Sequence, residues 1–109
     1  MNTTVQEIDK GVLVSVTGRI DTTNYNEFEK VTNELLSKNV RQIFLDCSKL
    51  TYISSSGLRV FLTVMKKMAE SGGQFKLIAM QPPIREIFDI SGFSSIFSIY
   101  PDLETAKQK

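Results

Sequence analysis

A chain of 109 residues, 41% of them hydrophobic, has the length and composition of one globular domain, and its formal net charge of +1 indicates neither a nucleic-acid partner nor a membrane surface. Histidine is absent, which excludes a Ser-His-Asp or Cys-His nucleophile and a histidine-ligated metal site built from this chain alone. One cysteine cannot form an intrachain disulfide, and no run reaches the ~20 apolar residues of a membrane span. The start of the chain lacks the basic and apolar segments of a signal peptide, so we expect one cytoplasmic domain, residues 1–109, without membrane insertion.

The first elements are predicted to be a β-hairpin and a helix. Residues 4–8 (TVQEI) and 12–18 (VLVSVTG) have the composition of two strands around a short turn. Val12, Val14 and Val16 alternate with other residues and give the second strand an apolar face, and Gly18 is expected to end it. Residues 21–24 (DTTN) are rich in N-cap types. The helix that follows, to residues 38–39, has an apolar stripe of Tyr25, Phe28, Val31, Thr32, Leu35 and Leu36.

A second strand and helix follow. Residues 40–48 (VRQIFLDCS) contain a continuous apolar run, Ile43 to Leu45, which is typical of a central strand covered on both faces. Three serines and a glycine, residues 54–57, then lead into the clearest helix of the chain, which residues 71–73 end. Its predicted core stripe comprises Leu58, Phe61, Leu62, Met65, Met68 and Ala69, widened by Val60 and Val64.

The last third predicts a strand at 74–80, a helix opened by Pro82-Pro83 and closed by Gly92, a short strand at 96–100 and a final helix from Pro101 to Lys109. The buried side of the helix after Pro82 is assigned to Ile84, Ile87 and Phe88, with Ile90 as a further candidate. The order β-β-α-β-α-β-α-β-α predicts an α/β fold with a mixed, mostly parallel β-sheet and about four α-helices. Function in such sheets concentrates at the carboxyl ends of strands, where the serines lie.

The serine stretch supports two interpretations. A helix N-terminus has unpaired N–H groups and a partial positive charge, so Ser54 or Ser55 could serve only as a cap. The same partial charge would accommodate a phosphate on Ser55 beside the N–H groups of Ser56, Gly57 and Leu58. Gly57 lacks a Cβ and would let another backbone or a nucleotide phosphate approach closely. The stretch matches neither the G-x-S-x-G of a nucleophile elbow nor the G-x-x-x-x-G-K-[ST] of a P-loop.

Residues 46–62 (DCSKLTYISSSGLRVFL) resemble the signature of STAS domains, especially the bacterial anti-sigma factor antagonists. The family pattern has an Asp at a strand end, then a Ser, an aromatic and a hydrophobic residue before Asp-Ser-[Ser/Thr]-Gly-Leu. This chain fits that pattern at Asp46, Ser48, Tyr52, Ile53, Ser55, Ser56, Gly57 and Leu58. Residues 18–21 (GRID) and 84–106 are also similar to the family, so the resemblance covers essentially the whole chain. Ser54 departs from it, standing where many phosphorylated members have Asp, and Arg19 stands where an acidic residue is frequent.

The resemblance implies a switch and not an enzyme, with no cofactor. In such antagonists the unmodified domain binds an anti-sigma factor, a GHKL-type serine kinase, which then releases its sigma factor. The kinase uses Mg-ATP to phosphorylate a serine, the antagonist dissociates, and a PP2C-type phosphatase resets the cycle. The family register assigns the modified serine to Ser55, with Ser54 and Ser56 as flanking alternatives. The resemblance leaves open whether the domain is a monomer or a weak dimer.

The residues expected to contact the partner are Asp21, Thr22, Thr23, Asp46, Ser54, Ser56, Gly57 and Leu58. Asp21 and Asp46 are expected at neighbouring loop ends, where Asp46 would either cap the serine loop or touch the partner. Residues 21–23 could also be only a helix start. Cys47 follows the apolar run of the predicted strand and is expected to be a small core residue. An alternative function, favoured by the departure at Ser54, is a STAS module without a phosphoswitch in a transporter or signalling complex.

Overall fold

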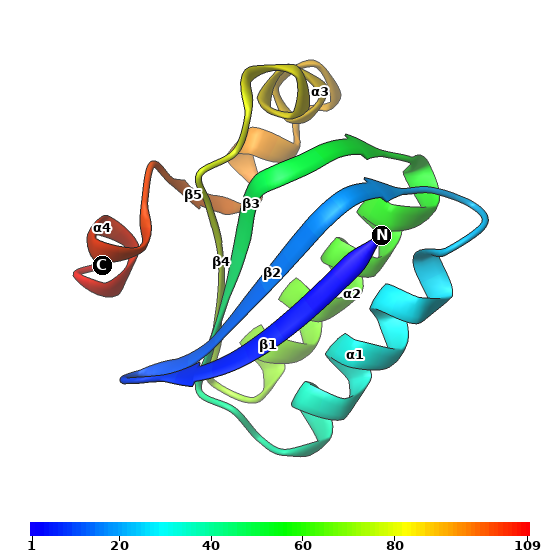
Figure 1. The fold of residues 1–109 in the computed structure, drawn as a ribbon. Coiled ribbons are helices and arrows are strands. Elements are labelled where there is room, and N and C mark those ends of the chain that lie inside the picture. Colours follow the sequence, from blue (N-terminus) through cyan, green and yellow to red (C-terminus); the bar gives the residue numbers. More distant parts are fainter.

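The computed structural model describes residues 1–109 and has its strands and helices in the predicted order (Figure 1). The strands are β1 (Asn2–Ile8), β2 (Gly11–Ile20), β3 (Gln42–Ile53), β4 (Gln74–Ile78) and β5 (Ser98–Tyr100). The helices are α1 (Tyr25–Ser37), α2 (Ser55–Glu70), α3 (Pro82–Ser91) and α4 (Leu103–Lys107). A short 3-10 helix, η1 (Phe93–Ser95), follows α3 and was not predicted from the sequence.

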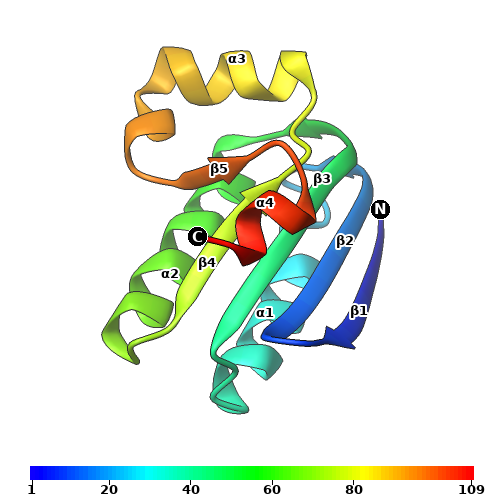
Figure 2. The ribbon, with the colours of Figure 1, turned by 90° about the vertical axis from the view of Figure 1, so that its left-hand side faces the viewer.

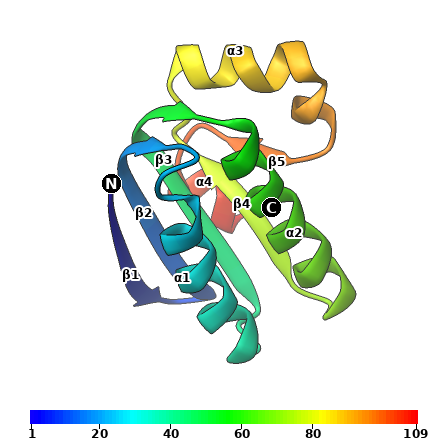
Figure 3. The ribbon, with the colours of Figure 1, turned by 90° about the vertical axis from the view of Figure 1, so that its right-hand side faces the viewer.

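The five strands form one mixed sheet in the order β1-β2-β3-β4-β5. β1 is antiparallel to β2, and all the other neighbours are parallel, so the prediction of a mixed, mostly parallel sheet is confirmed. Helices α1 and α2 cover one face, and α4 covers part of the other (Figures 1 and 3). Helix α3 lies across the end of the sheet at which β3 finishes and α2 begins (Figures 2 and 3). None of the helices is long and apolar enough to cross a membrane.

The main core lies between the sheet and helices α1 and α2. Val12, Val14 and Val16 all point into it and are buried, as their alternation predicts. The ring of Phe61 lies in this core, with its centroid 5.5 Å from that of Phe28 on α1 and 6.2 Å from that of Phe88 on α3. These aromatic contacts join α1 and α2 to α3, so the three helices pack together at this end of the sheet.

A smaller core lies under α4, on the other face of the sheet. Phe44, Ile78 and Ala106 are its buried members. Phe44 points into this cluster while Ile43 and Leu45 belong to the main core, which is why the apolar run in β3 has no polar interruption. The α4 backbone is held there by Lys76, a buried residue whose Nζ donates to the Ala106 carbonyl at 2.8 Å.

Two of the strands extend further than predicted. β2 continues beyond Gly18 to Ile20, because Gly18 takes a positive φ of 98° at a register irregularity and the pairing with β3 then resumes. β3 continues beyond Ser48 to Ile53, opposite this second half of β2. Cys47 lies well inside β3. Its side chain is buried in the main core, as expected for a small core residue.

The predicted buried faces of two helices also need correction. The buried residues of α2 are Gly57, Val60, Phe61, Val64 and Met68. The helix is thus rotated relative to the predicted stripe, with Leu58, Leu62 and Met65 half-buried and Ala69 exposed. In α3, Ile84 and Phe88 are buried one turn apart, whereas Ile90 is 79% exposed. Ile90 follows Phe88 by two residues and is therefore rotated from it by about 200° around the helix axis, which directs Ile90 to solvent.

Candidate functional site

Ser54 is the N-cap of α2, and its hydroxyl, its carbonyl and its N–H all form hydrogen bonds. Its backbone is extended (φ −85°, ψ 171°), and its Oγ accepts a hydrogen bond from the Gly57 N–H at 3.3 Å. Its carbonyl accepts from the Leu58 N–H at 2.9 Å, and its own N–H donates to the Ile20 carbonyl at 2.9 Å. Ser54 is only 9% exposed. The capping interpretation of the serine stretch is therefore confirmed for Ser54. Its side chain holds the start of α2 in place.

Ser55 is the first residue of α2 and is exposed. The N–H groups of the first helical turn lack intrahelical acceptors, and they place a partial positive charge beside this hydroxyl. Of the three N–H groups expected beside a phosphate, those of Gly57 and Leu58 donate to Ser54 in the unmodified domain, and that of Ser56 does not. The donors left at this end belong to Ser55 and Ser56, the latter half-buried.

Gly57 is buried and has a packing role. A Cβ built at this position would lie 2.8 Å from Ile20 Cγ2 and 2.8 Å from Ile53 Cγ1, closer than carbon atoms can approach without displacement. The glycine thus lets α2 rest directly on the ends of β2 and β3. The expectation that Gly57 leaves room for a phosphate or for another backbone was wrong, because two isoleucine side chains fill that space.

The loop between β2 and α1 lies beside the start of α2, joined to it by the hydrogen bond between Ser54 and Ile20. Asp21 Oδ1 accepts hydrogen bonds from the Thr23 N–H at 2.9 Å and the Thr23 hydroxyl at 2.6 Å. These bonds, with a smaller contribution from the Arg19 guanidinium, hold the pKa of Asp21 below its ordinary value. Asn24 Nδ2 donates to the Arg19 carbonyl at 2.9 Å. Thr22 and Thr23 are exposed on this ordered loop.

Asp46 does not join this cluster. It lies within β3, opposite Ser15 of β2 and Ile78 of β4, while the strand runs on to Ile53 before the serines begin. Its Oδ1 accepts a hydrogen bond from the Ser48 N–H at 2.9 Å. The expectation that Asp46 and Asp21 occupy neighbouring loop ends was wrong, because β3 is longer than its apolar run indicates. Asp46 consequently does not cap the serine loop.

Arg19 and Tyr52 were not assigned to the predicted site, yet the structure places them at its edge. They are paired residues of β2 and β3, and the Arg19 Cζ lies 4.3 Å from the centroid of the Tyr52 ring. Arg19 Nε lies 3.7 Å from Asp21 Oδ2. The signal available in the sequence was the alternation with buried Ile20 and Ile53, which directs both side chains away from the core. Their pairing depends on the strand register.

Comparison with known proteins identifies the family to which this fold belongs. The STAS domain family model matches residues 2–106. The chain belongs to the STAS domain family. A Bordetella bronchiseptica protein named "Putative anti-sigma factor antagonist BtrV" is 36% identical to this STAS domain over 106 residues, which are 97% of this chain and 91% of that protein.

Solved structures of STAS relatives have the same fold. The crystal structure of a Thermotoga maritima protein aligns with this STAS domain at a TM-score of 0.87 and 25% identity, over 97% of this chain and 92% of that one. The Bacillus protein SpoIIAA in its phosphorylated form aligns at a TM-score of 0.76 and 18% identity, over 98% of this chain and 97% of that one. The fold class predicted from the sequence is therefore that of the STAS family.

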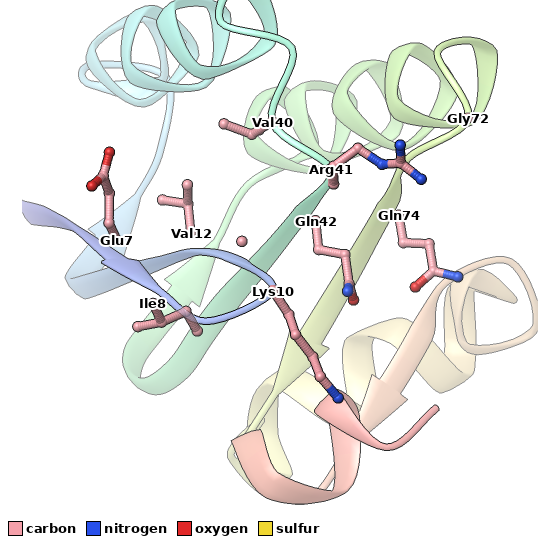
Figure 4. Close-up of a pocket in the computed structure, with 10 residues that line it drawn as sticks. Glu7, Ile8, Lys10, Val12, Val40, Arg41, Gln42, Gly72 and Gln74 are labelled. Atoms are coloured by element: carbon pink, nitrogen blue, oxygen red, sulfur yellow. The ribbon is translucent and has the colours of Figure 1, made fainter.

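The largest cavity of this STAS domain lies away from the serines. It has a volume of about 650 Å³ and is lined by the β1–β2 turn and by the first residues of β3 and β4, among them Lys10, Arg41, Gln42 and Gln74 (Figure 4). These residues precede β3 and β4 or begin them, whereas Ser54 follows the end of β3. The cavity therefore lies at the opposite end of the sheet from the serines.

The chemistry available within this STAS domain is limited. Burial raises the pKa of the Cys47 thiol to about 12, with the Asp46 carboxylate adding to the rise, so the thiol stays protonated and unreactive at neutral pH. No group of three or more histidine, cysteine, aspartate or glutamate side chains is placed to hold a metal ion. The groups best placed to contact another molecule are the exposed Ser55 hydroxyl and the ordered loop between β2 and α1.

Proposed function

We propose that this STAS domain is an anti-sigma factor antagonist that acts by binding, and that phosphorylation of Ser55 switches the binding off. The observation that carries the proposal is the placement of Ser55, an exposed hydroxyl between the anchored Ser54 and the tightly packed Gly57. The name of the B. bronchiseptica relative supports the antagonist activity. The existence of SpoIIAA, a protein of this fold, in a phosphorylated form supports the modification.

In the proposed cycle, the unmodified serine end of the domain binds an anti-sigma factor of the GHKL serine-kinase type, which then releases its sigma factor. The kinase transfers the γ-phosphoryl group of Mg-ATP to Ser55 Oγ, so that the Oγ–P bond forms as the bond to the ADP leaving group breaks. The serine proton passes to a base on the kinase. A PP2C-type phosphatase hydrolyses the phosphoserine. The antagonist supplies the acceptor hydroxyl and the binding surface.

The direction of the switch follows from electrostatics. A phosphate adds about −1.5 to −2 charges at pH 7. Two of the first-turn N–H groups are already occupied by Ser54, so they cannot neutralise this charge. Asp21 lies on the neighbouring loop, and its pKa is lowered, so it adds a further negative charge. A dianion that a contact surface leaves unpaired costs several kcal/mol, and a loss of about 3 kcal/mol weakens binding about a hundredfold.

The test is a calorimetric titration of a purified GHKL-type anti-sigma factor from the native host with the wild-type domain and with Ser55→Asp. We expect Ser55→Asp to weaken binding about a hundredfold while the circular dichroism spectrum and the urea midpoint stay close to those of the wild type. Ser37→Asp is the matched control, because Ser37 is exposed at the C-terminal end of α1 and receives the same charge. An unchanged affinity of Ser55→Asp would contradict the switch and favour a STAS interaction subunit without one.

A further inference from the structure

Arg19 presents a guanidinium group that is fixed in place and has unused donors. Its Cζ lies 4.3 Å from the Tyr52 ring centroid, and its Nε lies 3.7 Å from Asp21 Oδ2, too far for a strong hydrogen bond. Thr23 donates from its N–H and its hydroxyl to Asp21 Oδ1, so Oδ2 is the oxygen that faces the guanidinium. The Nε side of the guanidinium faces Asp21, and the four N–H groups on its two terminal nitrogens remain available to an outside acceptor.

The pair is also accessible. The Arg19 side chain is 60% exposed, and Tyr52 is 37% exposed, one of the few large apolar side chains at the surface. Arginine and tyrosine are enriched among the residues that dominate binding at protein interfaces. A guanidinium held against an aromatic ring loses less conformational freedom on binding than a free one. The arrangement is therefore suited to recognising an anion on another molecule.

Arg19 and Tyr52 lie on the face of the sheet that is turned away from α2. Ile20 and Ile53, the next residues of the two strands, pack against Gly57 of α2. Because successive side chains of a strand point to opposite faces, Arg19 and Tyr52 project from the face away from α2. The same two strand ends connect to Ser54 through the Ile20 carbonyl. The pair thus lies at the serine end of the sheet but faces outward.

We propose that Arg19, stacked on Tyr52, is the receptor for a carboxylate on the protein partner, so that it determines which partner this STAS domain accepts. The inference rests on the proposed function, since it uses the same binding partner. A carboxylate fits because a guanidinium pairs with its two oxygens through parallel hydrogen bonds. A phosphate on Ser55 itself is a poorer occupant, because Ser55 begins the helix on the opposite face of the sheet.

The test measures the affinity of the same purified anti-sigma factor for Arg19→Gln, Arg19→Glu and Tyr52→Leu, at two salt concentrations. We expect Arg19→Gln to weaken binding about tenfold, Arg19→Glu about a hundredfold or more, and Tyr52→Leu several-fold because the guanidinium loses its support. The wild-type affinity should fall more steeply with salt than that of Arg19→Gln. Arg41→Glu, at the far end of the sheet and also exposed, is the matched control. Urea unfolding of each variant checks that the fold is retained.

The outcomes separate this inference from the proposed function. If Ser55→Asp weakens binding but Arg19→Glu binds like the wild type, the inference is overturned and the switch stands. If the Arg19 substitutions alter only the behaviour of Ser55-phosphorylated protein, the guanidinium serves the phosphate within the chain, and the inference is also overturned. If the wild-type domain does not bind the anti-sigma factor, both fail. Equal losses for Arg19→Glu and Arg41→Glu would indicate long-range charge effects and overturn the specific role of Arg19.

Discussion

Replacing Gly57 with alanine tests whether the start of α2 is held by direct contact with the strand ends. The added Cβ would lie 2.8 Å from Ile20 Cγ2, 2.8 Å from Ile53 Cγ1 and 3.3 Å from Ile53 Cδ1. Both isoleucines are buried and β-branched, so they have little freedom to move aside. Overpacking of this kind costs about 1–3 kcal/mol. Alanine regains up to about 1 kcal/mol in helix propensity.

We therefore expect Gly57→Ala to lower the free energy of unfolding by up to about 2 kcal/mol, which corresponds to a fall of up to about 1 M in the urea midpoint. The measurement is urea unfolding followed by far-UV circular dichroism. Ser56→Ala is the matched control in the same turn of helix, and its stability should stay within about 0.5 kcal/mol of the wild type. A Gly57→Ala protein clearly more stable than the wild type would refute the close contact, because the gain in helix propensity would then exceed any packing cost.

Two further predictions concern titratable groups, one on the loop beside the serines and one inside β3. The folded-state pKa of Asp21 is below its ordinary value of 3.8, so its stabilising contribution is present above pH 3.8 and is lost as the pH falls through the folded-state pKa. NMR titration of the Asp21 carboxyl should give a midpoint below 3.8, and a midpoint at or above it would contradict the Thr23 hydrogen bonds. The Cys47 thiol, with a pKa of about 12 and a buried side chain, should not react with a thiol reagent at pH 8 until the protein is unfolded in urea. Rapid labelling of the native protein would show that β3 opens at this position.

The parts of the fold that follow from local patterns were predictable. Alternating Val12, Val14 and Val16 identify a strand with one buried face, and Pro82 and Gly92 delimit α3. Each of these signals acts within a few neighbouring residues, because alternation, a fixed proline φ and a left-handed glycine are properties of the local chain.

The parts that depend on tertiary contacts were not predictable. The second half of β3 carries only Leu50 and Ile53 as buried apolar residues, and it is a strand because β2 resumes its pairing after the irregularity at Gly18. Lys76 can be buried because its Nζ donates a hydrogen bond to the Ala106 carbonyl of α4, which is thirty residues away in the sequence. No local pattern contains either contact.

In the candidate site, too, local sequence identified some residues, whereas the roles of others depend on tertiary contacts. The residue types of the serine stretch and its place before a helix identified the start of α2, and the family register selected Ser55 within it. The roles of its neighbours required the structure, because Gly57 meets side chains from two different strands. The stacking of Arg19 on Tyr52 likewise depends on the register between β2 and β3. Asp46 was misplaced for the same reason, since the length of β3 sets its distance from the serines.

The most direct test of the central claim is phosphopeptide mapping by mass spectrometry on this protein isolated from its native host under phosphatase inhibition. We predict a single phosphate on Ser55, whose hydroxyl is exposed at the start of α2, and none on Ser54, which is buried and engaged as the cap. A phosphate on Ser54, or no phosphate under any growth or stress condition, would contradict the proposed switch at Ser55.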